Sequence, residues 1–420
     1  MPIHPTSLRR SLRLSAIEGI LAEVVGACAT GGVLTAWSIY LALGPMLCGL
    51  LGALPFAAQL LQLPAVVLAR RAGSRRTALV AVAVSRQAML PLALLPFLGL
   101  SPMLKEVVLL LCAGVSVILG VIANTAWTSW MGDLVPRAVR GRYFLRRNFL
   151  CALSSVAGSI AAGFALDGGV NAAGAATVLT ALALTASVAG LVTTWLLRLQ
   201  DEPPRNADPT APAVEEGVLP LRNAVARRAL ASQLAWGASS GLALAFYPLH
   251  FVGDLRTGFA RMAAFGSGLA AVRTFAAPAW ERILKKLGAG PVLVACAVGL
   301  SLSTALWFFA TDGVLWLLAV DAGLCGVLTA GYTLIASSLP IADSGPRERA
   351  CFLAAFASAG GLATGLAATL GAALAHVLAT RAGLLVATQL LFFLGALGRI
   401  TAALLGLRIV RSDLPIAARD

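Results

Sequence analysis

Long apolar stretches alternate with short polar connections along almost the whole chain. Most of them approach or exceed the roughly 20 apolar residues that cross the hydrocarbon core of a bilayer. None alternates apolar and polar positions with the period of two that a half-buried strand shows, so we expect helices, whose backbone groups are paired within the segment. We place twelve spans at residues 15–40, 44–68, 77–98, 104–127, 147–166, 174–197, 227–251, 260–281, 290–311, 314–338, 351–377 and 383–407. The pattern predicts an all-α membrane protein with twelve transmembrane helices.

One longer connection, rich in proline and charge, divides these spans into six and six. It contains Asp201-Glu202-Pro203-Pro204 and Asp208-Pro209, a composition typical of a linker. We therefore expect two pseudo-symmetric six-helix bundles, at residues 1–197 and 227–420, joined by a cytoplasmic linker at 198–226.

Basic residues concentrate in alternate connections, and cytoplasmic loops are the ones that retain Lys and Arg. The opposite connections hold only four of them, Lys105, Arg256, Arg261 and Arg381. The distribution predicts a multi-pass protein of the bacterial inner, or plasma, membrane with both termini in the cytoplasm.

Composition agrees with lipid as the solvent. Apolar residues make up 59% of the chain and charged residues 12%. The net charge of +14 is dispersed over the cytoplasmic segments without interleaved aromatic residues, so it indicates a leaflet preference and no nucleic-acid partner. The seven Cys residues lie in apolar stretches without metal-ligand spacing, which predicts small hydrophobic side chains. We expect no metal, no cofactor and no enzymatic activity.

Two kinds of loop occur once in each half. A basic, Gly-containing loop follows the second span of each half, at residues 69–76 and 281–288. A Pro-then-Arg loop follows the fourth span of each half, at residues 133–142 and 339–349. Matched loops at matched positions indicate an internal duplication.

With this layout the chain resembles the major facilitator superfamily of secondary transporters over nearly its whole length. The superfamily's loop G-x-x-x-D-R/K-x-G-R/K-R/K is matched at Arg71, Gly73 and Arg75, whereas Val66, Arg70 and Ser74 depart from it. The stretch 130–148 is similar to the loop between the fourth and fifth helices of a bacterial branch of the superfamily. The resemblance implies alternating access. The Gly-Pro signature of the antiporters is absent from span five.

These loops supply candidates for a cytoplasmic gate, in which Asp133 would pair with nearby guanidiniums in one state and release them in the other. The alternative is that the Arg residues only obey the positive-inside rule. The candidate gate residues are Arg70, Arg71, Gly73, Arg75, Asp133, Pro136, Arg140, Gly141, Arg142 and Arg147.

Ionisable residues within spans are functional candidates, because a charge at mid-bilayer costs about 2.5–3.5 kcal/mol. Glu18 and Glu23 lie roughly 140° apart on a helix, so we expect only one of them to face a given site. Arg86 and Arg273 either neutralise an anionic substrate or form ion pairs with Glu23 and Asp321. Arg399, near the end of span twelve, is expected to extend to the membrane surface.

The resemblance also implies that spans one, four, seven and ten line a central cavity. The polar and aromatic faces of the last three are candidates for this lining, and the alternative is hydrogen bonding between packed helices. The candidates are Asn124, Trp127, Gln233, Trp236, Ser240, Tyr247, Asp321, Thr329 and Tyr332.

The sequence thus predicts a monomeric secondary active transporter that moves a small molecule by alternating access and is coupled to protons through Glu23 or Asp321. Whether it exports or imports is left open. The alternative function is a non-transporting membrane scaffold or assembly protein of the same fold.

Overall fold

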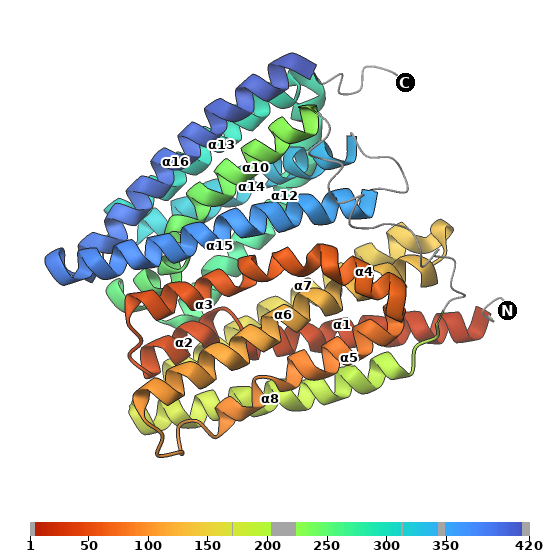
Figure 1. Ribbon diagram of the computed structural model, residues 1–420, viewed down its shortest axis with the longest axis horizontal. Coiled ribbons are helices and arrows are strands. Elements are labelled where there is room, and N and C mark those ends of the chain that lie inside the picture. The colour runs from red at the N-terminus through yellow and green to blue at the C-terminus, as the bar shows by residue number, and fades with distance from the viewer. Residues whose placement is uncertain (1–4, 170, 203–223, 312–313, 343–348, 414–420) are drawn as a thin grey trace. The chain divides into compact units, whose positions relative to one another are not determined.

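The computed structural model describes residues 5–169, 171–202, 224–311, 314–342 and 349–413, and Figure 1 shows their arrangement into helices. Every regular element in these ranges is helical. The prediction of an all-α, multi-pass membrane protein is therefore confirmed.

The first elements in chain order are α1 (Pro5–Ala29), α2 (Gly32–Tyr40), α3 (Pro45–Ala57), the 3-10 turn η1 (Ala58–Leu61), α4 (Gln62–Ala72), α5 (Ser74–Gln87), the 3-10 turn η2 (Leu90–Ala93), α6 (Pro102–Leu134), α7 (Arg137–Gly168) and α8 (Ala172–Arg198). The later ones are α10 (Ala224–Leu244), α11 (Phe246–Leu249), the π-helical turn η3 (His250–Asp254), α12 (Phe259–Leu287), α13 (Ala289–Phe309), α14 (Trp316–Ala342), α15 (Arg349–Ala382) and α16 (Leu384–Asp413).

In the described part of the chain, nine helical segments are long and apolar enough to cross a membrane. They match nine of the predicted spans. The other three predicted spans coincide with α5, α10 and α12. α5 has only 14 residues, whereas the described parts of α10 and α12 contain no stretch of 18 residues that is apolar enough. Twelve spans and cytoplasmic termini therefore stay predictions.

The contacts divide the chain into two compact units, which are described separately. The first comprises Met1–Leu43, Pro64–Pro212 and Gly258–Ala263, and the second comprises Gly44–Leu63, Ala213–Thr257 and Ala264–Asp420. The bundle boundaries expected at 1–197 and 227–420 stay a prediction.

The first unit is built on α1, α5, α6, α7 and α8, with α1 packed on α7 and α8, and α5 on α6 and α8 (Figure 1). Its core near the ends of α5, α6 and α8 contains Trp130, Met131 and Leu197, each at most 1% exposed. Small residues such as Ala78 and Ala126 complete this core and let the helices approach closely.

In the second unit, α15 packs on α10 and α3, and α16 packs on α13 and α10. Glycines bring α10 and α15 into backbone contact. A Cβ at Gly371 would lie 2.1 Å from the Leu242 carbonyl oxygen, and one at Gly241 would lie 2.3 Å from that of Thr364. The glycine-rich span eleven of the sequence is thus a close-packing face.

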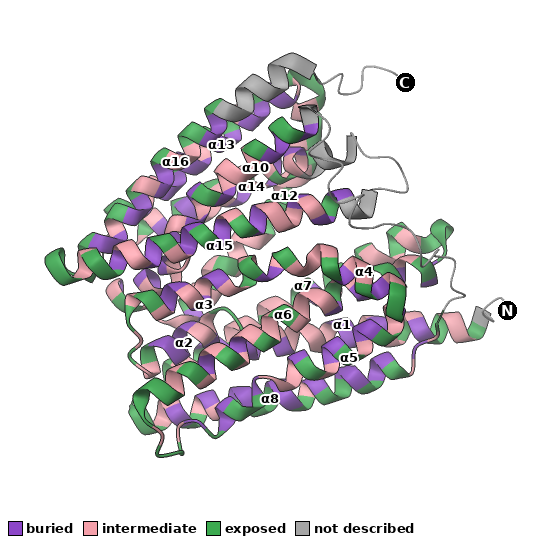
Figure 2. Cartoon of the chain, viewed as in Figure 1, coloured by how far each residue is buried: buried purple, intermediate pink, exposed green. Residues whose placement is uncertain are grey.

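Many large apolar residues are exposed, and Figure 2 shows the exposed positions of helices such as α6 and α8 in green. Leu111 is 63% exposed, Val188 is 61% exposed and Trp195 is 59% exposed. Apolar faces of this kind are expected of helices surrounded by lipid, and would be unfavourable in water.

Candidate functional site

A charged cavity of about 230 Å³ lies inside the first unit, between α1, α5, α6 and α7. Small side chains, among them Gly19, Ala22 and Gly120, leave the room for it. The polar residues that line it are Glu18, Glu23, Ser85, Arg86, Asn124, Trp127 and Arg147. Every predicted cavity residue of spans one, three and four is therefore brought together here.

Glu18 is the centre of the charge in this cavity. Its side chain is only 4% exposed, and its two carboxylate oxygens are held by different helices. Arg86 of α5 lies 2.8 Å from Oε1, and Arg147 of α7 lies 3.5 Å from Oε2. Charge-assisted contacts of this kind offset the cost of burying the three ionised groups.

Two aspects of this cluster differ from the sequence-based expectation. Arg86 was expected to pair with Glu23 if it formed an ion pair, but its partner is Glu18. Arg147, expected in the cytoplasmic gate, belongs to the cavity. The reason lies in α7, which begins at Arg137, so that Arg147 is already three turns inside the helix and faces α1.

Trp127 forms an aromatic wall beside the ion cluster. The guanidinium of Arg147 lies 4.2 Å from its ring centroid, and Phe144 meets the ring edge-on at 6.5 Å. The guanidinium and the ring attract each other through the charge and the ring quadrupole. Arg147 is thereby held between the carboxylate of Glu18 and the face of Trp127.

Buried donors in this cavity are left without partners. Nη1 of Arg86 and Nε1 of Trp127 make no hydrogen bond with any described residue. Such orphaned donors cost about 1–3 kcal/mol each, so two of them on residues that line one cavity indicate a place for an acceptor group.

Both Glu18 and Glu23 line the cavity, so the expectation that only one of them faces a given site is wrong. The cavity borders a wide part of the α1 surface, because Gly19 and Ala22 of that helix also line it. Glu23 is half-buried and forms no ion pair with a described residue.

In the second unit, Trp236 of α10 stacks on Tyr332 of α14, with ring centroids 4.0 Å apart and planes at 22°. The guanidinium of Arg399 lies 5.6 Å from the Trp236 centroid and donates to the Leu300 carbonyl at 3.1 Å and to Thr304. Arg399 therefore points inward, and its expected extension to the membrane surface is wrong, because these acceptors are available within the unit.

Asp321 of α14 is buried and hydrogen-bonded to side chains of α13. It is 3% exposed and accepts hydrogen bonds from Ser303 and from Nε1 of Trp307, the latter at 2.9 Å. Arg273, the alternative partner, is exposed and forms no ion pair with any residue that the structure describes. The pairing of Arg273 with Asp321 is therefore not seen.

The remaining candidates of spans seven and ten contribute to packing. Tyr247 stacks on Phe392 at 4.7 Å, and Thr329 contacts the Cys325 sulfur at 3.6 Å. A Cβ at Gly360 would lie 3.0 Å from the Gln233 amide nitrogen, and Ser240 has a buried hydroxyl without a partner among the described residues. Their expected role in a cavity stays a prediction.

The candidate gate residues do not form the expected carboxylate latch in this conformation. Asp133 is exposed and makes no ion pair with a described residue. Arg140 instead donates to main-chain oxygens of Gly132 and Val135. Arg75 donates to the Arg198 carbonyl at 2.8 Å and lies 3.7 Å from Glu202. The gate thus stays a prediction for another state of the protein.

Other gate candidates have local structural roles. Gly73 connects α4 to α5 with φ of 95°, in the region that favours glycine. Pro136 precedes the first residue of α7, where a fixed φ suits a helix start. The remaining candidates lie in helical turns: Arg70 and Arg71 in the last turn of α4, and Gly141 and Arg142 near the start of α7.

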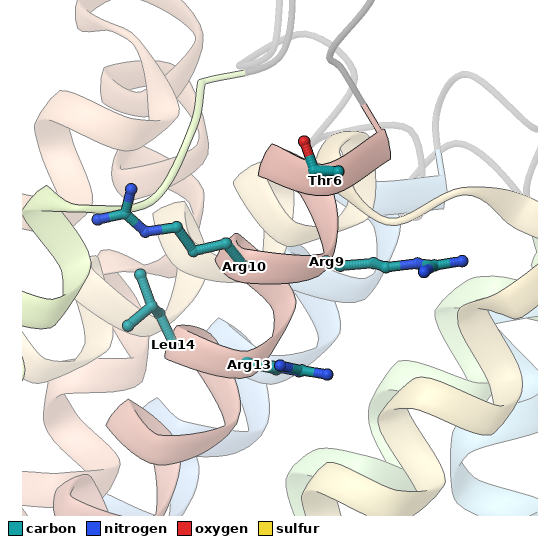
Figure 3. Close-up of a pocket in the computed structure, with 5 residues that line it drawn as sticks. All are labelled: Thr6, Arg9, Arg10, Arg13 and Leu14. Atoms are coloured by element: carbon teal, nitrogen blue, oxygen red, sulfur yellow. The ribbon is translucent and has the colours of Figure 1, made fainter.

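A second cavity, of about 380 Å³, lies at the start of α1 and is lined by Thr6, Arg9, Arg10, Arg13 and Leu14. Figure 3 shows Arg9 and Arg13 extending to the same side of the helix and Arg10 to the opposite side. All five residues come from one helix and include no acidic residue. The cytoplasmic location predicted for this basic segment stays a prediction.

Sequence reasoning missed one carboxylate. Asp167, at the end of α7, accepts the backbone N–H groups of Phe259 at 2.7 Å and Ala260 at 2.9 Å, and so caps the start of α12 within the first unit. A cap supplied by a residue so distant in sequence leaves no local pattern. No group of residues suited to holding a metal ion occurs in the described ranges.

The chain is similar in structure to known proteins, but no match was found in sequence. No family model matches the chain, and no curated protein matches it. The nucleoside transporter NupG has a TM-score of 0.72 at 12% identity, with 96% of this chain and 99% of that chain covered.

Two further solved structures agree. A bacterial homologue of the iron transporter ferroportin, in an inward-facing state, has a TM-score of 0.71 at 13% identity, covering 96% of this chain and 99% of its own. The xylose transporter XylE from E. coli, in an inward open conformation, has a TM-score of 0.66 at 12% identity, covering 94% and 95%. These proteins share the transporter architecture expected from the sequence, and this chain has the fold of the major facilitator superfamily.

Proposed function

We propose that the protein is a secondary transporter that moves a small molecule across the inner membrane by alternating access. The observation that carries the proposal is the cavity of the first unit, in which two carboxylates and two guanidiniums meet inside a membrane-spanning bundle. Intramembrane charges are costly and mark substrate or ion pathways. The fold, shared with transporters of several substrates, supports the same conclusion.

A scaffold without transport activity would have no use for this cavity. Glu18 with two arginines could serve packing alone, but Glu23 and the unpartnered donors of Arg86 and Trp127 add polar groups that packing does not need. Buried polar groups without partners lower stability. The cavity therefore favours transport over the scaffold alternative.

We further propose that Glu23 carries the coupled proton. It lines the cavity, is half-buried and has no ion-pair partner among the described residues, so its carboxylate is accessible to a proton. Both carboxylate oxygens of Asp321 already accept hydrogen bonds, one from Ser303 and one from Trp307. Of the two acids that the sequence offered, the contacts favour Glu23.

The test is flux in proteoliposomes under an imposed pH gradient, with a broad panel of small molecules and a pH-sensitive dye inside the vesicles. We expect at least one compound to accumulate with proton entry, Glu23→Gln to uncouple the two, and Asp321→Asn to retain the coupling. No accumulation above protein-free vesicles, for any compound in the panel, would contradict transport. Retained coupling in Glu23→Gln would contradict the role of Glu23.

A further inference from the structure

The cavity of the first unit has an imbalance of charge that points to the class of substrate, and the inference rests on the proposed transport function. Arg86 and Arg147 share the single carboxylate of Glu18, so these three ionised groups leave one positive charge. The fourth ionisable group in the lining is Glu23. When Glu23 is protonated and neutral, the four groups therefore carry a net charge of plus one, which a monoanion would neutralise.

The unused hydrogen-bond donors specify the chemistry of that anion. Arg86 uses Nη2 for Glu18, and its other terminal nitrogen, Nη1, is buried without a partner among the described residues. Nε1 of Trp127 is in the same condition, and both residues line the cavity. Two N–H donors from separate side chains suit the two oxygens of a carboxylate, because each oxygen accepts hydrogen bonds and carries part of the charge.

The rest of the lining limits the size and polarity of the substrate. The cavity measures about 230 Å³, below the roughly 300–1,000 Å³ of pockets for drug-sized ligands. Ala22, Val82 and Ala123 give it apolar walls, and Trp127 adds an aromatic one. Inorganic phosphate is partly a dianion near neutral pH and has no apolar part that could lie against these walls.

We infer that this cavity binds a small organic monocarboxylate, whose carboxylate accepts hydrogen bonds from Arg86 and Trp127 and whose apolar part lies against the small residues of α1, α5 and α6. The proton on Glu23 and the anion then enter together, and the transported pair is electrically neutral. The ionisable residues that share the cavity lining with Glu23 are Glu18 of its own helix, Arg86 of α5 and Arg147 of α7, and Cys151 of α7 lies within electrostatic range of Glu23.

The inference can be tested by binding to the purified full-length protein in detergent, which requires no membrane gradient. The probes are acetate, hexanoate and benzoate, each compared with its amide, together with inorganic phosphate. We expect at least one acid to raise the unfolding temperature in a saturable way and to bind at least about tenfold more tightly than its amide, a difference of about 1.4 kcal/mol. Phosphate should have no such effect.

Two conservative variants test the donors while keeping the cluster folded. Arg86→Lys keeps the charge and removes the forked donor, and Trp127→Phe keeps the aromatic wall under Arg147 and removes only the N–H. Both should weaken binding of the acid by about tenfold or more and leave binding of the amide unchanged. Arg381→Gln, at an exposed residue in the last turn of α15, is the matched control and should bind like the unmodified protein.

Equal affinity for acids and amides would overturn the inference, as would unchanged acid binding in both Arg86→Lys and Trp127→Phe. These outcomes are distinct from a failure of transport. Acid binding without flux in vesicles would contradict the proposed function and leave the site intact, whereas flux of another class of compound without acid binding would contradict the substrate class alone.

Discussion

Arg86 donates to Glu18 across 2.8 Å, and the exposed fractions of the two side chains are only 14% and 4%. The contact joins α5 to α1 inside the first unit, and Arg147 joins α7 to the same carboxylate. One carboxylate of α1 thus neutralises buried guanidiniums from two other helices, α5 and α7.

Replacing Glu18 should therefore destabilise the protein strongly. In Glu18→Ala two guanidiniums remain buried without their counter-ion, and breaking a buried pair costs about 3–5 kcal/mol. Chemical denaturation in detergent measures the loss. In a double-mutant cycle with Glu18→Gln and Arg86→Gln, the double variant should lose less than the sum of the single variants, by about 0.5–3 kcal/mol. Strict additivity would mean that the pair contributes no coupling.

Two glycines at matched loops should resist substitution. Gly73 precedes α5 with φ of 95°, and Gly288 precedes α13 with φ of 76°. A side chain at such angles costs about 1–3 kcal/mol, so Gly73→Ala and Gly288→Ala should each lower the free energy of unfolding by about this amount. Gly114→Ala is the control, because Gly114 lies inside α6 with open space around it. That variant should gain about 0.5–1 kcal/mol, and a loss of similar size in all three would contradict the strain argument.

Asp167 should matter for the start of α12. Its carboxylate accepts the N–H groups of Phe259 and Ala260, and removing a helix cap costs about 0.5–2 kcal/mol. We expect Asp167→Ala to speed hydrogen exchange at these two amides. Asp133→Ala, at an exposed carboxylate that forms no ion pair with a described residue, should change the free energy of unfolding by less than about 0.5 kcal/mol. Unchanged exchange at Phe259 in Asp167→Ala would contradict the cap.

The backbone contact of α10 with α15 leaves no room for larger residues. Gly371→Ala would place a methyl group 2.1 Å from the Leu242 carbonyl oxygen, and overpacking of this kind costs about 1–3 kcal/mol. Thermal unfolding should show a lower transition temperature. Gly323→Ala in α14, where nothing lies within 4 Å of the new methyl group, should not lower it. Equal effects of the two substitutions would show that backbone approach is not the cause.

The sequence predicted the parts of this protein that depend on local composition. Apolar length gave the helices, and the matched loops at Gly73 and Gly288 predicted the duplication that led to the fold. It also predicted functional roles for Glu18, Glu23, Arg86, Asn124 and Trp127, because charged or polar residues in a span are costly. All five residues line one cavity, and their function stays a prediction.

The predictions that were wrong or missing concern contacts between residues far apart in the chain. The choice of Glu18 over Glu23 as the partner of Arg86, the inward direction of Arg399 and the cap by Asp167 all depend on how helices rotate against one another. Composition and periodicity fix the lipid-facing side of a helix but not its rotation to within one residue. The same limit applies to Arg147, which lies at a predicted boundary between loop and span.

The ion cluster also imposes an order on biosynthesis. Glu18 emerges from the ribosome first, Arg86 follows with α5, and Arg147 follows only with α7. Glu18 has no counter-ion until Arg86 has been made, 68 residues later, and Arg147 reaches the same carboxylate only after 129 residues. The first unit therefore reaches its lowest-energy arrangement only after α7 has entered the membrane, and shorter translation products should be targets for membrane quality control.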